Sequence, residues 1–284
     1  MPNEFVLTLS CANRPGIVAG VATHLYEAGY DIRDAQQFDD AETGDFFMRV
    51  LFAPARETAS DEPATAFTEV AERFAMRWTL RPRSERQRVA LLVSKFDHCL
   101  ADLLYRWRLG ELPMDLVAVI SNHPRESFAH LDFEGVAFHH LPVTRATKLE
   151  QETRLWELIR DSGAELVVLA RYMQVLSDGL AAKLSGRCIN IHHSFLPGFK
   201  GAKPYHQAHE RGVKLIGATA HYVTAELDEG PIIAQDTFPV GHRETVADLK
   251  RIGSDLERVV LARSVRWHLE RRILIDGRRT VVFQ

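Results

Sequence analysis

The sequence predicts an α/β protein of two domains: a small ferredoxin-like sandwich, then a larger, doubly wound and mostly parallel sheet. The chain has 284 residues, which is long for one domain. A charged, proline-containing stretch at residues 81–88 interrupts the apolar patterns. Apolar residues alternate with polar ones before this stretch and form continuous runs after it. We therefore expect domains at residues 1–83 and 88–284, joined by a linker at 84–87.

The first domain is predicted to have the element order β-α-β-β-α-β. The patterns indicate strands at residues 5–10, 32–38, 46–52 and 77–81, and helices at 17–28 and 64–76. The acidic, glycine-containing turn DDAETGD between the second and third strands indicates a hairpin. This order is typical of a ferredoxin-like sandwich.

The loop ANRPG follows the first strand and starts the first helix. Proline and glycine at such a position can simply form the turn that begins a helix. Together with the element order, however, the loop resembles the ligand loop of ACT regulatory domains, which bind amino acids and pair through sheet edges or helices. The resemblance implies an amino-acid effector site, although such domains often serve only as assembly surfaces. The candidate contacts are Asn13, Arg14, Pro15, Gly16 and Ile17.

The second domain is predicted to contain buried parallel strands. Continuous apolar runs indicate strands at residues 89–94, 116–121 and 166–170, with a further strand at 136–140 and helices at 100–109 and 147–161. Strands that alternate with helices of this length are typical of a doubly wound, Rossmann-like sheet. Ligands of such sheets lie beyond the carboxyl ends of the strands. Neither G-x-G-x-x-G nor G-x-x-x-x-G-K-[ST] occurs, so no motif supports a nucleotide site.

Composition excludes several classes of partner. A formal net charge of −3 gives no reason to expect binding to nucleic acid or to a membrane surface. The first residues lack a basic leader, and no stretch approaches the roughly 18 apolar residues of a membrane span. Three widely spaced cysteines, Cys11, Cys99 and Cys188, suggest no disulfide framework. We therefore expect a cytoplasmic protein.

The stretch from Asn190 to Asp236 carries the candidate chemistry. Asn190 and His192 end an apolar run and, on a strand, point to the same face. Asp228 follows in a polar turn. An amide, an imidazole and a carboxylate that converge can promote attack on a carbonyl carbon, because the first two stabilise an oxyanion and the third orients the imidazole or removes a proton from water. Taken singly, each could also be a cap, a structural histidine or a turn residue.

The same stretch resembles the formyltransferase family, which uses 10-formyltetrahydrofolate. The resemblance rests on Asn190-Ile191-His192, Ser194, Leu196-Pro197, Lys200-Gly201-Ala202 and Asp228-Glu229-Gly230. It implies that Asn190, His192 and Asp228 are the catalytic trio. The segment ARYMQVLS, residues 170–177, resembles the family's loop that holds the pterin ring through backbone groups. The candidate substrate-binding residues are Met173, Val175, Leu176, His193, Gly201 and His221.

Three features of the sequence indicate which acceptor receives the formyl group within this family. They are the ACT-like module, the His193-Ser194 pair where the purine-pathway transformylase usually has Pro-Ser, and the run HYVTAELDEGPII. They resemble the members that send the formyl group to water, which implies hydrolysis to tetrahydrofolate and formate without a cofactor. Transfer to an amine such as glycinamide ribonucleotide, and a non-catalytic folate or amino-acid sensor, remain alternatives. One departure is Lys203, where the family commonly has Asn.

Several side chains in this stretch could in principle bind a metal ion. The competent ligands are His192, His193, His206, His209 and Asp228. No H-E-x-x-H or similar spacing occurs, so we expect no metal.

We expect a homo-oligomer, a dimer or a tetramer, because a small ferredoxin-like sandwich exposes sheet edges and a face that association can cover.

Overall fold

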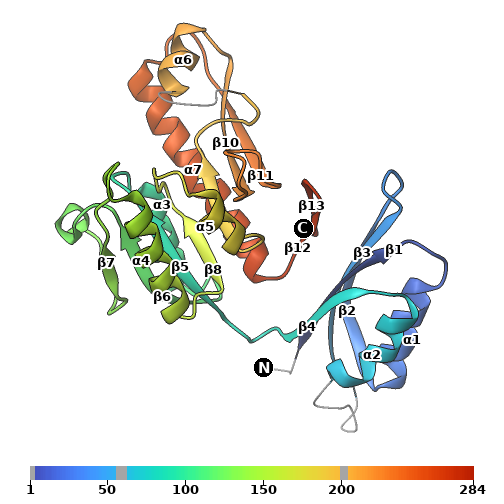
Figure 1. Ribbon diagram of the computed structural model, residues 1–284. Helices are drawn as coiled ribbons and strands as arrows, with labels where there is room; N and C mark the ends of the chain where they lie inside the picture. Colours follow the sequence, from blue (N-terminus) through green and yellow to red (C-terminus); the bar gives the residue numbers. More distant parts are fainter. Residues whose placement is uncertain (1–3, 56–62, 199–203) are drawn as a thin grey trace. The chain divides into compact units, whose positions relative to one another are not determined.

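The computed structural model describes residues 4–55, 63–198 and 204–284 (Figure 1). The chain forms two compact units. One contains Met1–Glu85 with Glu270–Asp276 and Val281–Gln284, and the other contains Arg86–Leu269 with Gly277–Thr280. Among the helices of the described residues, none is long and apolar enough to cross a membrane.

The first unit is the predicted ferredoxin-like sandwich. Its four strands pair antiparallel in the order β2-β3-β1-β4. The elements are β1 (Phe5–Ala12), α1 (Ile17–Glu27), β2 (Tyr30–Asp40), β3 (Asp45–Pro54), α2 (Pro63–Arg73) and β4 (Arg77–Pro82). Alternate residues of β1, such as Leu7 and Leu9, pack with Val21 of α1 and Phe67 of α2 in one core. The alternation in the sequence therefore places one face of the sheet against both helices.

The other face of this sheet carries a buried charge. Arg49 of β3 is 4% exposed, and its Nη1 lies 3.2 Å from Asp34 Oδ2. Its Nη2 donates to the Glu270 carbonyl at 3.2 Å, and Gln36 Nε2 donates to the Gln284 carbonyl at 3.2 Å. These bonds associate the C-terminal residues with the first unit, whereas the predicted larger domain extended to residue 284.

The second unit is built on a seven-stranded sheet. Its order is β11-β10-β9-β8-β5-β6-β7, with parallel pairs from β9 to β7 and antiparallel pairs at β10 and β11. The strands are β5 (Gln87–Val93), β6 (Met114–Ser121), β7 (Phe138–His140), β8 (Leu166–Leu169), β9 (Cys188–His192), β10 (Leu215–Tyr222) and β11 (Ile232–Pro239). The predicted doubly wound, mostly parallel sheet is confirmed.

Helices and a hairpin complete the chain after residue 86. They are α3 (His98–Arg108), the 3₁₀ helix η1 (Arg125–Phe128), α4 (Lys148–Asp161), α5 (Asp178–Lys183), α6 (Pro204–Glu210), α7 (Val246–Leu269), and the paired strands β12 (Ile273–Asp276) and β13 (Arg279–Val282). Close packing of α6 on α7 requires a glycine in α7. A Cβ at Gly253 would lie 1.9 Å from Tyr205 Oη, so any side chain there would displace the Tyr205 ring.

Candidate active site

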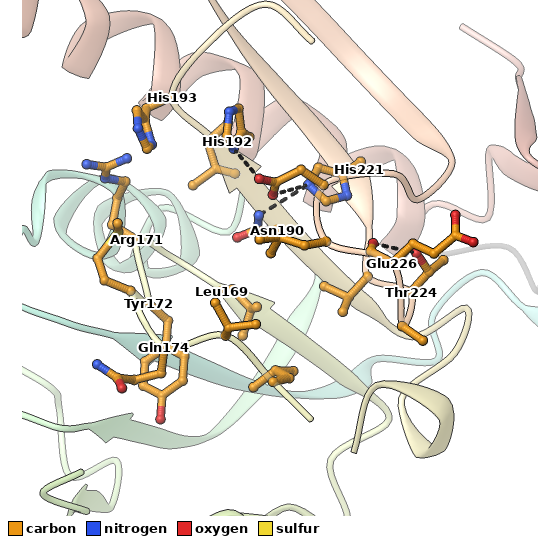
Figure 2. A pocket seen from close by; sticks show the side chains of 18 residues that line it. Leu169, Arg171, Tyr172, Gln174, Asn190, His192, His193, His221, Thr224 and Glu226 are labelled. Atoms are coloured by element: carbon orange, nitrogen blue, oxygen red, sulfur yellow. Dashed lines mark hydrogen bonds and ion pairs between the residues drawn. The ribbon is translucent and has the colours of Figure 1, made fainter. Parts of the chain in front are cut away.

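Three neighbouring strands bring the candidate residues together. In the sheet register, Asn190 of β9 pairs with Leu169 of β8 and with His221 of β10, and His192 pairs with Thr219. Asn190, His192 and His221 therefore meet beyond the carboxyl ends of β8 and β9, where ligands of such sheets bind. They line a cavity of about 300 Å³ together with Asp228 (Figure 2).

Asp228 reaches the cavity from the turn that follows β10. Its Oδ2 lies 3.3 Å from His192 Nδ1, and its Oδ1 lies 3.7 Å from His221 Nε2. Asp228 has a φ of 57°, a left-handed conformation that non-glycine residues adopt mostly where the surroundings require it. Two residues on, a Cβ at Gly230 would lie 1.8 Å from the Tyr222 carbonyl oxygen. The turn that presents Asp228 therefore depends on this glycine.

Burial and hydrogen bonding act in opposite directions on Asp228. Burial raises the pKa of its carboxyl group, while the hydrogen bond and charge of His192 and the nearby imidazole of His221 lower it. The lowering effects dominate, and they hold the pKa well below its usual range. Asp228 is therefore an ionised acceptor at neutral pH, directly beside the His192 imidazole.

Hydrogen bonds fix the orientation of Asn190 and His221. His221 Nδ1 lies 2.9 Å from the Tyr222 carbonyl oxygen. Because a carbonyl oxygen only accepts, this nitrogen carries a hydrogen. His221 Nε2 then accepts from Asn190 Nδ2, 3.2 Å away, since Asp228 Oδ1 at 3.7 Å is beyond hydrogen-bond distance. One hydrogen of the Asn190 amide remains to donate to a substrate.

The loop at residues 170–177 forms the apolar wall of the cavity. Met173 and Val175 are 53% and 52% exposed, and Leu176 also lines the cavity. The backbone is held by buried Ser94, whose Oγ accepts from Met173 N at 2.9 Å and donates to Asn122 Oδ1 at 2.7 Å. Exposed apolar side chains on a fixed backbone are suited to the face of an aromatic ring system.

His193 lies directly after β9 and contacts His192. The two rings stack with centroids 4.9 Å apart and an interplanar angle of 21°. Burial, followed by the charges of Arg171 and His192, lowers the pKa of His193 to about 4. Its ring is therefore uncharged at neutral pH.

The remaining predicted site residues divide into two groups. Gly201 and Lys203 lie outside the described residues. His206 and His209 are on α6 and are not among the residues that line the cavity. The structure thus brings together the predicted trio, Met173, Val175, Leu176, His193 and His221, all of which line the same cavity.

Sequence reasoning missed a buried polar network beside this cavity. Glu257 of α7 is 1% exposed. Its carboxylate accepts a hydrogen bond from Tyr205 Oη at 2.7 Å and lies 2.8 Å from His98 Nε2. Arg171, which lines the cavity, places its Nε 3.3 Å from the same carboxylate. One signal was available: Glu257 lies four residues from Gly253 and from Leu261, on the buried face of α7.

This network also contains a group with possible metal ligands. Among the described residues, such a group is formed by His98, Cys99 and Glu257, with ligand atoms within 4.8 Å of one another. Burial raises the pKa of the Cys99 thiol well above its usual value, and the Glu257 carboxylate is already bonded to His98 and Tyr205. The Glu257 carboxylate is thus already used by hydrogen bonds within the protein.

The ACT-type loop uses its side chains within the first unit. Arg14 donates to the Arg73 carbonyl, and its guanidinium lies 4.8 Å from the centre of the Phe74 ring. Ile17 is 2% exposed and belongs to the core. Asn13, Pro15 and Gly16 are exposed, and Gly16 begins α1 with a φ of 96°. The effector site at this loop remains a prediction.

Comparison with known families agrees with both units. The formyl transferase family model matches residues 87–265, and the ACT domain model matches residues 5–62. The fold and the site therefore define a formyltransferase-type enzyme that carries an ACT domain.

Relatives of full length define the family more narrowly. Formyltetrahydrofolate deformylase from Corynebacterium sp. (strain P-1) is 51% identical over 280 residues, which cover 98% of each chain. The deformylase from Escherichia coli (strain K12) is 39% identical over 98% of this chain and 97% of its own. The crystal structure of the Burkholderia mallei deformylase aligns with a TM-score of 0.93 at 51% identity, covering 100% of both chains. This chain belongs to the formyltetrahydrofolate deformylase family.

A structure from another branch covers less of the chain. Glycinamide ribonucleotide transformylase 1 from Symbiobacterium toebii aligns with a TM-score of 0.64 at 33% identity. The alignment covers 70% of this chain and 95% of the transformylase.

Proposed function

We propose that this enzyme hydrolyses 10-formyltetrahydrofolate to tetrahydrofolate and formate in the cavity beyond β8 and β9. The observation that carries the proposal is the convergence of Asn190, His192 and ionised Asp228 on that cavity, in a chain similar over its full length to deformylases. The pterin ring contacts the apolar side chains and backbone of the loop at residues 170–177, which leaves the formyl group at the polar end.

Hydrolysis proceeds by attack of water on the formyl carbon. The water oxygen forms the new bond, one of its protons passes to the Asp228 carboxylate, and the carbonyl electrons move to the formyl oxygen. Asn190 Nδ2 and His192 donate hydrogen bonds to this oxyanion. The oxyanion electrons then re-form the carbonyl bond as the carbon–nitrogen bond breaks, and the folate nitrogen takes the proton held by Asp228, which returns to the carboxylate. The product leaves as formic acid, which loses its remaining acidic proton to water and becomes formate. No cofactor enters these steps.

Several residues position this chemistry. The Asp228 carboxylate orients the His192 ring through Nδ1, and the turn at Gly230 fixes the carboxylate itself. His221, tied to the Tyr222 carbonyl, accepts from one side of the Asn190 amide and directs its other hydrogen toward the substrate. Groups held in place before the substrate arrives need little reorganisation in the transition state.

A formate assay separates this proposal from its alternatives. Purified enzyme is incubated with 10-formyltetrahydrofolate alone, and formate is measured. Release of formate without an added amine is expected for hydrolysis. Product that appears only with an amine such as glycinamide ribonucleotide would indicate a transferase, and no turnover under either condition would indicate a sensor.

We further propose that the enzyme is cytoplasmic. Cys11, Cys99 and Cys188 are buried free thiols, consistent with a reducing cytoplasm.

We propose that copies of the chain associate through the first unit, where β2 and β4 are the edge strands of the sheet. Unpaired edge strands offer backbone donors and acceptors to a second copy. An amino acid bound near residues 13–17 would be positioned to influence such an assembly.

A further inference from the structure

Arg171 is a buried cation in the wall of the active-site cavity. It follows β8 with a φ of 64° and is 9% exposed. Arg171 lies two residues beyond Leu169, the last residue of β8, and lines the same cavity as His192 and His193. Figure 2 shows its guanidinium directed toward His193. A guanidinium is thus held close to the reacting end of the cavity.

The fold uses only part of the hydrogen-bonding capacity of this guanidinium. Nε lies 3.3 Å from Glu257 Oε2, but neither Nε nor Nη1 forms a hydrogen bond with a described residue. Glu257 divides its carboxylate among Arg171, His98 and Tyr205. Buried donors without partners are rare and commonly indicate a missing ligand or water.

His193 adds a second polar group at the same place. Its ring stacks on His192 and lines the cavity with Arg171. The charged and titratable groups that affect it are Arg171, His192, Glu257 and Asp228, and the ring of Tyr205 lies 6.3 Å away. Burial and the nearby cations keep the ring uncharged at neutral pH, so it retains an N–H donor.

We propose that Arg171 and His193 form a subsite for the formate that the reaction releases, an inference that rests on the proposed hydrolysis. Formate is a small carboxylate generated beside His192, and a guanidinium offers paired donors that match a carboxylate. The carboxylates of the substrate's glutamate tail are the other source of this chemistry. Formate fits the position better, because the Arg171 guanidinium is directed toward His193, whose ring stacks on that of His192 at the polar end of the cavity (Figure 2).

Product inhibition tests the subsite. Hydrolysis of 10-formyltetrahydrofolate is measured with added sodium formate, with sodium chloride holding the ionic strength constant. Arg171→Gln should raise the inhibition constant for formate at least about tenfold, because it removes a charge-assisted contact, with little change in KM for the folate. Arg171→Lys keeps the charge and should lose less. Arg160→Gln, at an exposed arginine of α4, is the matched control and should behave as the wild type.

The results distinguish a formate subsite from a contact to the substrate's glutamate tail and from failure of the proposed hydrolysis. Equal inhibition by formate in the wild type and in Arg171→Gln overturns the subsite, as does a wild type that formate does not inhibit. A raised KM with unchanged inhibition assigns the guanidinium to the substrate's tail and also overturns it. If the wild type releases no formate, the proposed function itself fails. Thermal melting checks folding, and if Arg171→Gln does not fold, Arg171→Lys and His193→Gln supply the comparison.

Discussion

At the scale of single residues, turnover depends most directly on the ionised state of the Asp228 carboxyl group. Burial alone would raise the pKa of this carboxyl group, but His192 and His221 lower it further than burial raises it. The ionised carboxylate can therefore both orient His192 and accept a proton from water at neutral pH.

Replacing Asp228 by asparagine should separate chemistry from binding. Asp228→Asn retains the size of the side chain but removes the charge, so kcat should fall by roughly 10²- to 10⁴-fold. Affinity for the folate, measured by equilibrium binding, should change little, because the loop at residues 170–177 holds the ring. Asp161→Asn, at an exposed position of α4, is the control. Unchanged kcat in Asp228→Asn would remove this residue from the mechanism.

His193 should make the stability of the protein depend on mildly acidic pH. Its pKa falls from the ordinary 6.5 to about 4 in the folded protein, so between these values the unfolded chain binds more protons than the folded one. Stability is therefore lost as pH falls from 6.5 toward 4, by at most on the order of 3 kcal/mol. Asp228, with its lowered pKa, loses its contribution only in more acidic solution.

The variant His193→Gln tests this linkage. Chemical unfolding from pH 7 to pH 4.5 should show a shallower loss of stability than in the wild type, because glutamine has no proton to gain. His209→Gln, at an exposed histidine of α6, should keep the slope of the wild type. Identical slopes for the wild type and His193→Gln would contradict the buried, uncharged state of His193.

The turn after β10 shows how an element presents a reactive group. Gly230→Ala would force a methyl group against the Tyr222 carbonyl oxygen, so the turn that carries Asp228 must shift. We expect a loss of about 1–3 kcal/mol in the free energy of unfolding, with a fall in kcat. Gly179 of α5 has open space around its Cβ position, so Gly179→Ala should preserve both quantities. Thermal melting and steady-state kinetics measure the two effects, and equal behaviour of the two variants would contradict the role of the turn.

Some elements could be predicted because their signals are local. The buried runs of β5, β6 and β8 are continuous in sequence, and the spacing of Asn190 and His192 follows from strand geometry. β10 gives no comparable signal because it is rich in small residues. A Cβ at Gly217, for example, would lie 2.9 Å from Phe195 Cβ, so small residues there reflect tertiary packing. The Arg171–Glu257 contact joins residues far apart in sequence and likewise cannot be derived from local patterns.

The architecture of the complete chain combines an ACT domain with a formyltransferase domain. Motifs predicted the two domains and the family, both confirmed by relatives that match over nearly the whole chain. The bonds of Arg49 to Glu270 and of Gln36 to Gln284 could not be predicted, because they join the first unit to residues at the other end of the chain. Such long-range pairing leaves no local periodicity in sequence.

Self-association should be visible in solution. Because β2 and β4 leave sheet edges to be covered, light scattering on the purified enzyme should give the mass of a dimer or a tetramer. A monomer across the micromolar range would contradict assembly through the first unit. Addition of free amino acids in the same measurement would reveal whether the loop at residues 13–17 responds to an effector.

The most direct test of the account follows the oxygen that attacks the formyl carbon. The enzyme is given 10-formyltetrahydrofolate in water labelled with oxygen-18, and the formate is analysed by mass spectrometry at early times, with an enzyme-free control for exchange. Attack by water assisted by Asp228 predicts labelled oxygen in the formate, at a rate equal to the appearance of tetrahydrofolate. Tetrahydrofolate formed without labelled formate would contradict water as the acceptor.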